Sequence, residues 1–350
     1  MPDNDVFVEM ECCQLCHDGE DVCGDDYRFE RLENENRHLA VLSDGLGSGI
    51  KANLLACMTT TMALEFIRSN MDVLLSAEII MDTLPVCEVR RISYATFSIF
   101  DLQIGGKSRI IEMDNPPFIH LRNGNDLKVN RQSMVSERWP DRRVHLAEIY
   151  AIAGDRLIAF SDGVTQAGLG QPGNKFGWRR EGALAFIQKA IEKDPAISAR
   201  DLSQMVVMAA RGQNKDNRCI DDISCMVIYL RKPRRMRLLT GPPFRADSDA
   251  AYADLVRNFD GKIVLSGGTT ANIVSRELGR PLEVDMKLVM KAGSLPPPAK
   301  MKGVDLVTEG ILTLTDVAQR LEADPPLTTP VPLVSKELIA MYRASDEIEF

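Results

Sequence analysis

The stretch His38-Leu39-Ala40-Val41-Leu42-Ser43-Asp44-Gly45-Leu46-Gly47-Ser48-Gly49-Ile50-Lys51-Ala52 decides how this chain is organised. Its apolar first half is typical of a buried strand, and that strand ends on an aspartate. Three glycines at alternate positions follow before a helical pattern begins. A backbone of this kind can approach a ligand or an ion closely beside the carboxylate of Asp44. Taken alone, the stretch is also compatible with a strand–turn–helix connection in which Asp44 caps a turn.

Three other apolar stretches carry acidic residues at their margins. Gly24 precedes Asp25 in a strand expected over 22–29, and an apolar run at 156–160 leads into Ser161-Asp162-Gly163. The pair Asp221-Asp222 instead begins an apolar run that extends to residue 230. If these strands belong to one pair of sheets, four carboxylates converge on one edge: Asp25, Asp44, Asp162 and Asp221.

Carboxylates gathered at one edge repel one another and raise each other's pKa values. Hard divalent cations relieve this repulsion, and Mg²⁺ and Mn²⁺ prefer oxygen ligands. Two such ions about 3.5–4 Å apart bridge a water, lower its pKa and stabilise an oxyanion during in-line attack. The substrate that this chemistry implies is a phosphate ester. The sequence contains neither a Gly-x-Ser-x-Gly motif nor a Gly-x4-Gly-Lys-Ser/Thr loop, which would indicate other chemistries.

Composition indicates a globular protein with an acidic surface. The 350 residues are 45% hydrophobic and 26% charged, and the formal net charge is −8. This charge argues against nucleic acid or an anionic membrane as the main partner. The first residues have no basic and apolar segments of the signal-peptide type, and no run of some 18 apolar residues occurs. We therefore expect a cytoplasmic protein with no membrane span.

The eight cysteines are expected to be reduced, because a large cytosolic chain seldom carries disulfides. The cluster Cys12-Cys13-x-x-Cys16 together with Cys23 suggests a zinc or iron–sulfur site as an alternative. Against it, residues 6–14 alternate as a strand does, and no second CxxC pair follows downstream. The pattern therefore favours free thiols over a structural metal.

The order of the expected elements is not a βαβ repeat. Strands are expected near 6–14, 22–29, 38–43, 94–101, 108–113, 118–121, 156–160 and 221–230, and helices near 48–68, 76–84, 180–193 and 198–210. Gly105-Gly106 marks a hairpin between the two strands that flank it. Strands followed by helix pairs in this order predict antiparallel sheets packed together, with the helices outside.

The sequence pattern changes after residue 231. We expect a basic, proline-punctuated linker over 232–246, a small α/β domain of unknown role over 247–324, and a proline-rich tail over 325–350 with a terminal helix near 333–343. Gly267-Gly268-Thr269-Thr270 opens a helix and could donate N–H groups to an anion, although a tight turn with a helix cap explains it as well. Sensing, partner docking or assembly into a homodimer are hypotheses for this part.

Four of these motifs occur in the order found in a known family. Gly24-Asp25, Asp44-Gly45-x-Gly-x-Gly, Ser161-Asp162-Gly163 and Asp221-Asp222-Ile223-Ser224 resemble the motifs of PPM-type metal-dependent protein serine/threonine phosphatases, and most of all the bacterial SpoIIE/RsbU-like group. The resemblance covers about residues 1–231. It implies an α-β-β-α sandwich with a two-ion manganese or magnesium centre that dephosphorylates phosphoserine or phosphothreonine on a regulatory protein.

The resemblance also implies a role for each acidic residue. Asp44 would bridge both ions, and the carbonyl of Gly45 would bind one of them. Asp25 would hold one ion largely through water, while Asp162 and Asp221 would hold the other. Asp222 would then support the site without binding an ion. The helix pair over 48–84 would be a switch element, because it begins directly after the metal-binding pair.

Some features depart from the family pattern. No histidine matches the general acid of eukaryotic relatives, and Arg28, Arg31 and Arg37 are only candidates for binding the phosphate. The leading hypothesis is a phosphoprotein phosphatase that acts on a bacterial signalling protein, such as an anti-sigma-factor antagonist. The alternatives are a non-catalytic regulatory module with a phosphatase-like fold, or a hydrolase of a small phosphorylated molecule.

Overall fold

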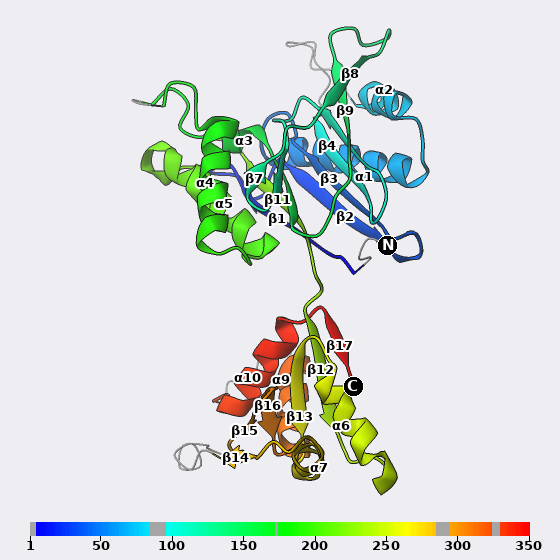
Figure 1. Cartoon of the computed structure of the whole chain (residues 1–350). Helices are drawn as coiled ribbons and strands as arrows, with labels where there is room; N and C mark the ends of the chain where they lie inside the picture. Colours follow the sequence, from blue (N-terminus) through cyan, green and yellow to red (C-terminus); the bar gives the residue numbers. More distant parts are fainter. Residues whose placement is uncertain (1–4, 85–95, 172–173, 285–294, 324–329) are drawn as a thin grey trace. The chain divides into compact units, whose positions relative to one another are not determined.

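The computed structural model describes residues 5–84, 96–171, 174–284, 295–323 and 330–350. The chain divides into two units, Met1–Lys232 and Pro233–Phe350, called the N-terminal unit and the C-terminal unit below (Figure 1).

Two antiparallel sheets form the centre of the N-terminal unit. The β1 sheet has the strand order β1 (Phe7–Leu15), β11 (Ile223–Arg231), β10 (Asp155–Phe160), β6 (Ile119–Arg122) and β7 (Asn125–Asp126). The β3 sheet has the order β2 (Asp26–Leu32), β3 (Arg37–Ser43), β4 (Phe97–Gln103), β5 (Ser108–Met113), β9 (Arg143–Ile149) and β8 (Arg131–Val135). All pairings within both sheets are antiparallel, as the order of elements predicts.

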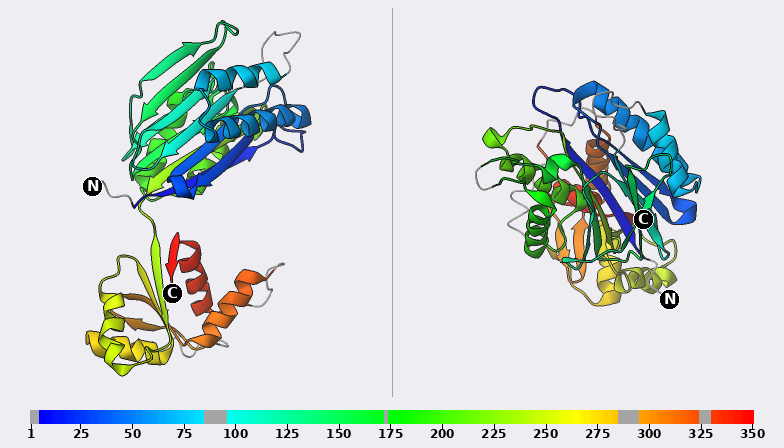
Figure 2. Two further views of the ribbon diagram at one scale, coloured as in Figure 1. Left: turned by 90° about the vertical axis from the view of Figure 1, so that its right-hand side faces the viewer. Right: turned by 90° about the horizontal axis from the view of Figure 1, so that it is seen from above.

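Helices cover the outer face of each sheet, which gives four layers. The helices α1 (Gly49–Arg68) and α2 (Val73–Thr83) lie on one side, and α3 (Asp162–Thr165), α4 (Arg179–Lys193) and α5 (Ala199–Gln213) on the other (Figures 1 and 2). The strand β3 is apolar along its whole length because both of its faces are buried. Ala40 and Leu42 face the β1 sheet, while Leu39 and Val41 pack against α1 and α2. The predicted α-β-β-α sandwich is confirmed.

Two predicted boundaries in this unit are wrong. The strand expected over 22–29 begins only at Asp26, because its partner β3 ends at Ser43, directly opposite. Residues 22–25 therefore have no strand to pair with and form an irregular turn. The helix expected from residue 76 begins at Val73, because the side chain of Asp72 accepts a hydrogen bond from the amide of Leu75 at 2.9 Å. Residues 94–95 of the expected strand over 94–101 lie outside the described residues.

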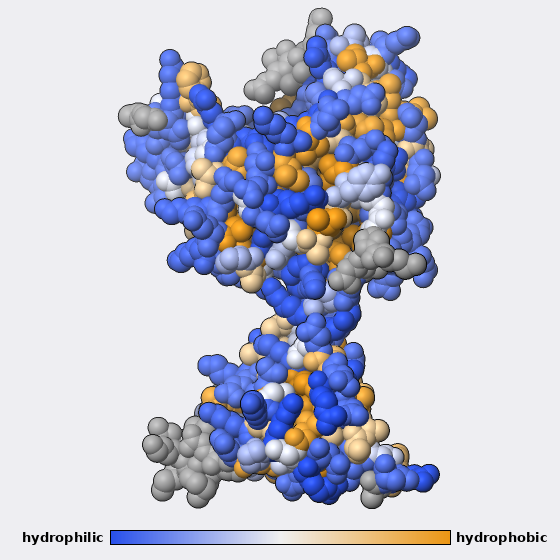
Figure 3. All heavy atoms as spheres, viewed as in Figure 1, coloured by the Kyte–Doolittle hydropathy of each residue, from blue (hydrophilic) through white to orange (hydrophobic). Residues whose placement is uncertain are grey.

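One helix among the described residues, α1, is long and apolar enough to cross a membrane. This is weak evidence for a span, because a core helix of a globular protein meets the same criterion. Ala52, Ala56 and Ala63 of α1 are buried, and the helix packs on β2, β3 and β4. On the face of the N-terminal unit seen in Figure 3, hydrophilic residues are interspersed among the hydrophobic ones.

The C-terminal unit is built on a mixed sheet with the order β14 (Glu283–Val284), β15 (Ala299–Met301), β16 (Val304–Thr308), β13 (Lys262–Ser266), β12 (Arg235–Thr240) and β17 (Glu347–Glu349). The last four strands of this order are parallel. The helices α6 (Asp249–Arg257) and α7 (Gly268–Leu278) contribute to one hydrophobic core, and α9 (Ile311–Glu322) and α10 (Leu333–Arg343) to a second. This arrangement confirms a small α/β domain.

The predicted boundaries of that domain are too narrow on both sides. The predicted linker over 232–246 contains β12, whose Met236 and Leu238 are buried between α-helices and sheet. Proline and arginine residues hid this alternation in the sequence. The predicted tail over 325–350 contains the expected terminal helix, α10, but also β17, which pairs with β12. Arg235 and Glu347 form an ion pair of 2.7 Å across these two strands.

Candidate metal centre

Antiparallel pairing brings the ends of several strands to one edge of the sandwich. In the β3 sheet, Asp26 at the start of β2 lies opposite Ser43 at the end of β3. In the β1 sheet, Phe160 at the end of β10 lies opposite Cys225 near the start of β11. The four aspartates expected to converge occupy the adjacent positions of these strands: Asp25, Asp44, Asp162 and Asp221. The structure therefore brings all four to the same edge.

The environment of Asp25 and Asp44 disfavours negative charge. Asp25 is 2% exposed, and burial raises the pKa of its carboxyl group to about 8, although hydrogen bonds with Ser224 and Ser161 oppose this shift. Burial also raises the pKa of Asp44 well above its usual range, and the charge of Asp25 raises it further. The Asp44 carboxyl group additionally shares a hydrogen bond with that of Asp162. The charged forms of these carboxyl groups repel one another.

Asp162 and Asp221 complete the acidic set. Burial raises the pKa of Asp162, and a hydrogen bond with Asp44 lowers it again in part. Burial and the charge of Asp162 raise the pKa of Asp221 to about 6. A set of partly buried, mutually repulsive oxygen donors fits hard divalent cations such as Mg²⁺ or Mn²⁺, since a cation compensates the charge that burial penalises.

The backbone beside Asp44 is packed too closely for any residue except glycine. A Cβ atom on Gly45 would lie 2.2 Å from the carbonyl oxygen of Ala52 and 2.5 Å from that of Gly24. A Cβ atom on Gly163 would lie 2.1 Å from the carbonyl oxygen of Asp222. The glycines after Asp44 and Asp162 thus allow the loops that carry the aspartates to pack against each other.

Several neighbours that hold the aspartates were not predicted. The hydroxyl group of Thr96 bonds to both the amide and the carbonyl group of Asp44, at 3.0 and 2.8 Å. Gln166 donates to the Asp162 carboxylate at 2.6 Å, and Ser224 donates to the Asp25 carboxylate at 2.5 Å. Ser224 stands in a quoted motif and could have been proposed, whereas Thr96 has no local signal because it meets Asp44 only through the pairing of β3 with β4.

The carboxylate of Asp222 contacts the connection between β1 and β2. Its Oδ1 atom accepts a hydrogen bond from the amide of His17 at 2.9 Å. An electrostatic interaction with His17 lowers the pKa of Asp221 slightly and so opposes the effect of burial. His17 is therefore the histidine that the structure places beside the acidic set, and its position in the sequence gives no sign of this.

The three candidate arginines are engaged elsewhere. Arg37 lies at the opposite end of β3 from Asp44 and pairs with Asp101 at 2.6 Å. Arg31 donates to the carbonyl oxygen of Val8 at 3.0 Å. Arg28 donates to the side chain of Thr60 on α1 at 3.2 Å. None of these contacts reaches the four aspartates.

A cavity lies along the same edge. It has a volume of about 380 Å³ and is lined by Glu112, Asp114, Asn115, Pro117, Arg131, Asp141, Arg143 and His145. The side chain of Asn115 donates to the carbonyl oxygen of Leu42 at 3.3 Å, which places the cavity near the end of β3. Its basic residues come from β8 and β9, in a part of the sequence without a motif.

A four-layer sandwich with acidic residues at one edge of two antiparallel sheets defines the PP2C-like fold of PPM phosphatases. The family model described as "Stage II sporulation protein E (SpoIIE)" matches residues 34–231, more than half of the chain, and the chain belongs to this family. No curated protein matches the chain.

A solved structure with the same fold is similar to this chain over the N-terminal unit. The PP2C phosphatase domain with a regulatory fragment of the cell fate determinant SpoIIE from Bacillus subtilis is 18% identical, with a TM-score of 0.52 over 65% of this chain and 62% of that chain. The RsbU and RsbW domains of Rv1364c from Mycobacterium tuberculosis are 14% identical, with a TM-score of 0.49 over 72% of this chain and 68% of that chain.

The glycine-rich turn of the C-terminal unit lies at the carboxyl end of β13. Gly267 has a φ of +115°, and α7 begins at the next residue. A cavity of about 330 Å³ adjoins this turn and is lined by residues that include Gly268, Asn272 and Glu309. The side chains at the start of α7 make no capping hydrogen bond. Anion binding and a tight turn at the start of the helix both stay open as interpretations of this segment.

Proposed function

We propose that the N-terminal unit is a metal-dependent protein serine/threonine phosphatase that acts on a phosphorylated bacterial regulatory protein. Its membership of the SpoIIE family supports this proposal. The observation that carries it is the meeting of four aspartates at one edge of the two sheets, one buried and three partly buried. Burial raises the pKa of each of them, and neighbouring aspartates raise it further for Asp25, Asp44 and Asp221. Such a set of carboxylates lowers the stability of the folded state unless cations bind to it.

The proposed ligands are those that the sequence predicts. Asp44, with the carbonyl group of Gly45, and Asp25 would hold one ion, and Asp44, Asp162 and Asp221 the other. Two bound Mn²⁺ or Mg²⁺ ions would supply an activated water and compensate the charge of a phosphate ester. The residues around them fix the carboxylates: Thr96 anchors the backbone of Asp44, and Gln166 orients Asp162. Hydrogen bonds to the backbone or the carboxylate of a ligand residue maintain the geometry of the ligand.

The cavity beside the end of β3 supports a polypeptide substrate. Pro117 is the one apolar residue in its lining, and Arg131, Arg143 and His145 stand beside three acidic residues. A mixed-charge surface of this kind suits a polar, charged polypeptide segment around a phosphoserine or phosphothreonine. We propose that this cavity binds the protein part of the substrate.

Hydrolysis assays test the function. We expect the purified chain to hydrolyse p-nitrophenyl phosphate and a phosphoserine protein only with Mn²⁺ or Mg²⁺. Asp44→Ala and Asp162→Ala should each lose activity by at least a hundredfold, whereas Asp247→Ala, an exposed residue of the C-terminal unit, should not. Full activity in Asp44→Ala would exclude the two-ion mechanism.

A calorimetric titration separates the alternatives. If no divalent ion binds at millimolar concentration, the unit is a non-catalytic module with a phosphatase fold. If ions bind and only small phosphate esters are hydrolysed, the substrate is a small molecule. The retention of all four aspartates favours catalysis over a non-catalytic role.

A further inference from the structure

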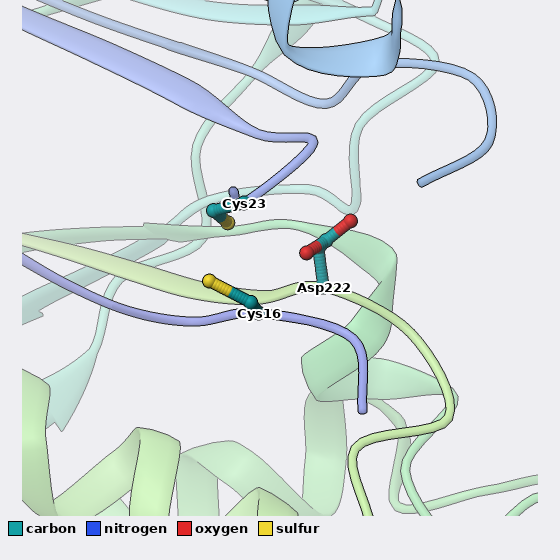
Figure 4. Close-up of side chains that lie close together, drawn as sticks. All are labelled: Cys16, Cys23 and Asp222. Carbon is teal, nitrogen blue, oxygen red and sulfur yellow. The ribbon is translucent and has the colours of Figure 1, made fainter. Parts of the chain in front are cut away.

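A second group of possible metal ligands lies beside the acidic centre. Cys16 directly follows β1, Cys23 lies in the turn before β2, and Asp222 precedes β11. Their two sulfur atoms and a carboxylate oxygen all lie within 4.8 Å of one another, which holds for one such group in the part of the chain that the structure describes. Figure 4 shows the three side chains in the space between these loops. The complete group could not be recognised in the sequence, because Asp222 lies near the other end of the N-terminal unit from Cys16 and Cys23.

The carboxylate of Asp222 is buried and only half satisfied. The residue is 3% exposed, and its Oδ1 atom accepts the amide hydrogen of His17 at 2.9 Å. Its Oδ2 atom has no hydrogen-bond partner within the described residues and would lie 2.6 Å from a Cβ atom on Gly24. An unpartnered buried carboxylate oxygen is unfavourable, and a cation would compensate it.

The donors differ in kind from those of the acidic centre. Thiolates select soft or borderline cations such as Zn²⁺, whereas Mg²⁺ and Mn²⁺ prefer carboxylates and water. In tetrahedral zinc sites with Zn–S near 2.3 Å and Zn–O near 2.1 Å, ligand atoms lie about 3.5–3.8 Å apart, which is compatible with the spacing of Cys16, Cys23 and Asp222. Cys12 and Cys13 are not available to this site, because they pack into the cores on opposite faces of the β1 sheet.

We propose that Cys16, Cys23 and Asp222 bind one thiophilic divalent cation such as Zn²⁺. This ion would hold the connection that carries Asp25 against the start of β11. The ion joins the turn between β1 and β2 to the start of β11. Asp25 lies two residues after Cys23, and Asp221 directly precedes Asp222. The proposed ion would therefore connect the segment that carries Asp25 to the segment that carries Asp221.

Cobalt substitution of the full chain tests this site. After chelation under reducing conditions, we expect one Co²⁺ per chain to give the intense near-ultraviolet absorption of thiolate-to-cobalt charge transfer. Zn²⁺ should abolish this absorption at equal concentration, whereas a large excess of Mg²⁺ should not. Cys16→Ser and Cys23→Ser should each weaken Co²⁺ binding at least tenfold and diminish the band.

Two further variants complete the design. Cys13→Ser, on β1 and outside the group, should keep both the band and the affinity. Asp222→Asn should keep the band, because both thiolates remain, and bind Co²⁺ at least tenfold more weakly. Circular dichroism of each variant shows whether it is folded.

Three results would overturn the proposal. These are the absence of charge-transfer absorption in the folded wild-type chain, an undiminished band in folded Cys16→Ser and Cys23→Ser, and a Cys16–Cys23 disulfide whose reduced form binds no cobalt. None of these measurements uses phosphatase activity. A chain without that activity therefore leaves the thiolate site standing, and loss of the site leaves the proposed function standing.

Discussion

The hydroxyl group of Ser224 donates a hydrogen bond of 2.5 Å to the carboxylate of Asp25. The two residues are 199 positions apart and belong to different sheets: Ser224 lies on β11, and Asp25 directly precedes β2. Gln14 on β1 in turn donates to the Ser224 hydroxyl group at 3.0 Å. The buried Asp25 carboxylate is thus tied to the opposite sheet, which fixes its place at the shared edge.

Removing this donor should weaken the acidic centre. The hydrogen bond from Ser224 lowers the pKa of Asp25, so Ser224→Ala should raise that pKa above about 8. We expect about tenfold weaker binding of Mn²⁺ at pH 7.5, and an acid limb of the activity profile that moves to higher pH. Ser203→Ala on α5, also buried, is the matched control and should change neither quantity. An unchanged acid limb in Ser224→Ala would contradict the expectation.

The stability of the metal-free chain should fall as pH rises. In the folded state, burial raises the pKa of Asp25 to about 8 and that of Asp221 to about 6, both above the 3.8 of an exposed aspartate. A carboxyl group with a raised folded-state pKa holds its proton in the folded chain and loses it on unfolding. Its contribution to stability is therefore complete below pH 3.8 and is lost as pH rises toward 8.

Divalent cations should reverse this loss. At pH 8, Mn²⁺ at a hundredfold excess over its Kd should raise Tm by about 5–10 °C, and by less at pH 5, where protons compete with the ion. Asp44→Asn should raise the Tm of the metal-free chain at pH 8, since it removes one repelling group, and should reduce the gain from Mn²⁺. Differential scanning calorimetry at both pH values measures the effect, and equal gains at pH 5 and pH 8 would count against it.

The cavity near the end of β3 should distinguish protein from small substrates. Arg143 lines this cavity, and its loss should lower kcat/KM for a phosphoserine protein about tenfold, equivalent to about 1.4 kcal/mol. The activity on p-nitrophenyl phosphate should stay within twofold of wild type, since that ester does not reach beyond the phosphate site. Arg138→Ala is the control, because Arg138 pairs with Asp82 at 2.8 Å and does not line the cavity. Equal losses on both substrates in Arg143→Ala would reject protein binding in this cavity.

The sequence predicts the individual strands better than it predicts which strands pair with each other. The apolar run that ends at Asp44 is readable because both of its faces are buried, and a glycine directly after an aspartate marks a strand end. Strand pairing has no local signal, so the contacts of Thr96 with Asp44 and of Ser224 with Asp25 were not predicted. The sequence pattern named Cys16 and Cys23 as part of an alternative metal site but favoured free thiols, because nothing local shows that β11 brings Asp222 to them.

Gly45 and Gly47, which follow Asp44, allow the effects of a steric clash and of backbone strain to be tested separately. Gly45→Ala places a methyl group 2.2 Å from the carbonyl oxygen of Ala52, so the strand-to-helix junction must shift. We expect a loss of about 2–3 kcal/mol in the free energy of unfolding and at least a hundredfold loss of phosphatase activity, because the shift displaces Asp44.

Gly47→Ala is the matched variant, since Gly47 has a φ of +102° and nothing within 4 Å of its Cβ position. It should cost about 1 kcal/mol through backbone strain alone and leave most of the activity. Urea denaturation and hydrolysis of p-nitrophenyl phosphate with Mn²⁺ measure both variants. Equal activity of Gly45→Ala and Gly47→Ala would show that the close packing of Gly45 against Ala52 does not position Asp44. The glycines would then be needed only for the conformation of the turn.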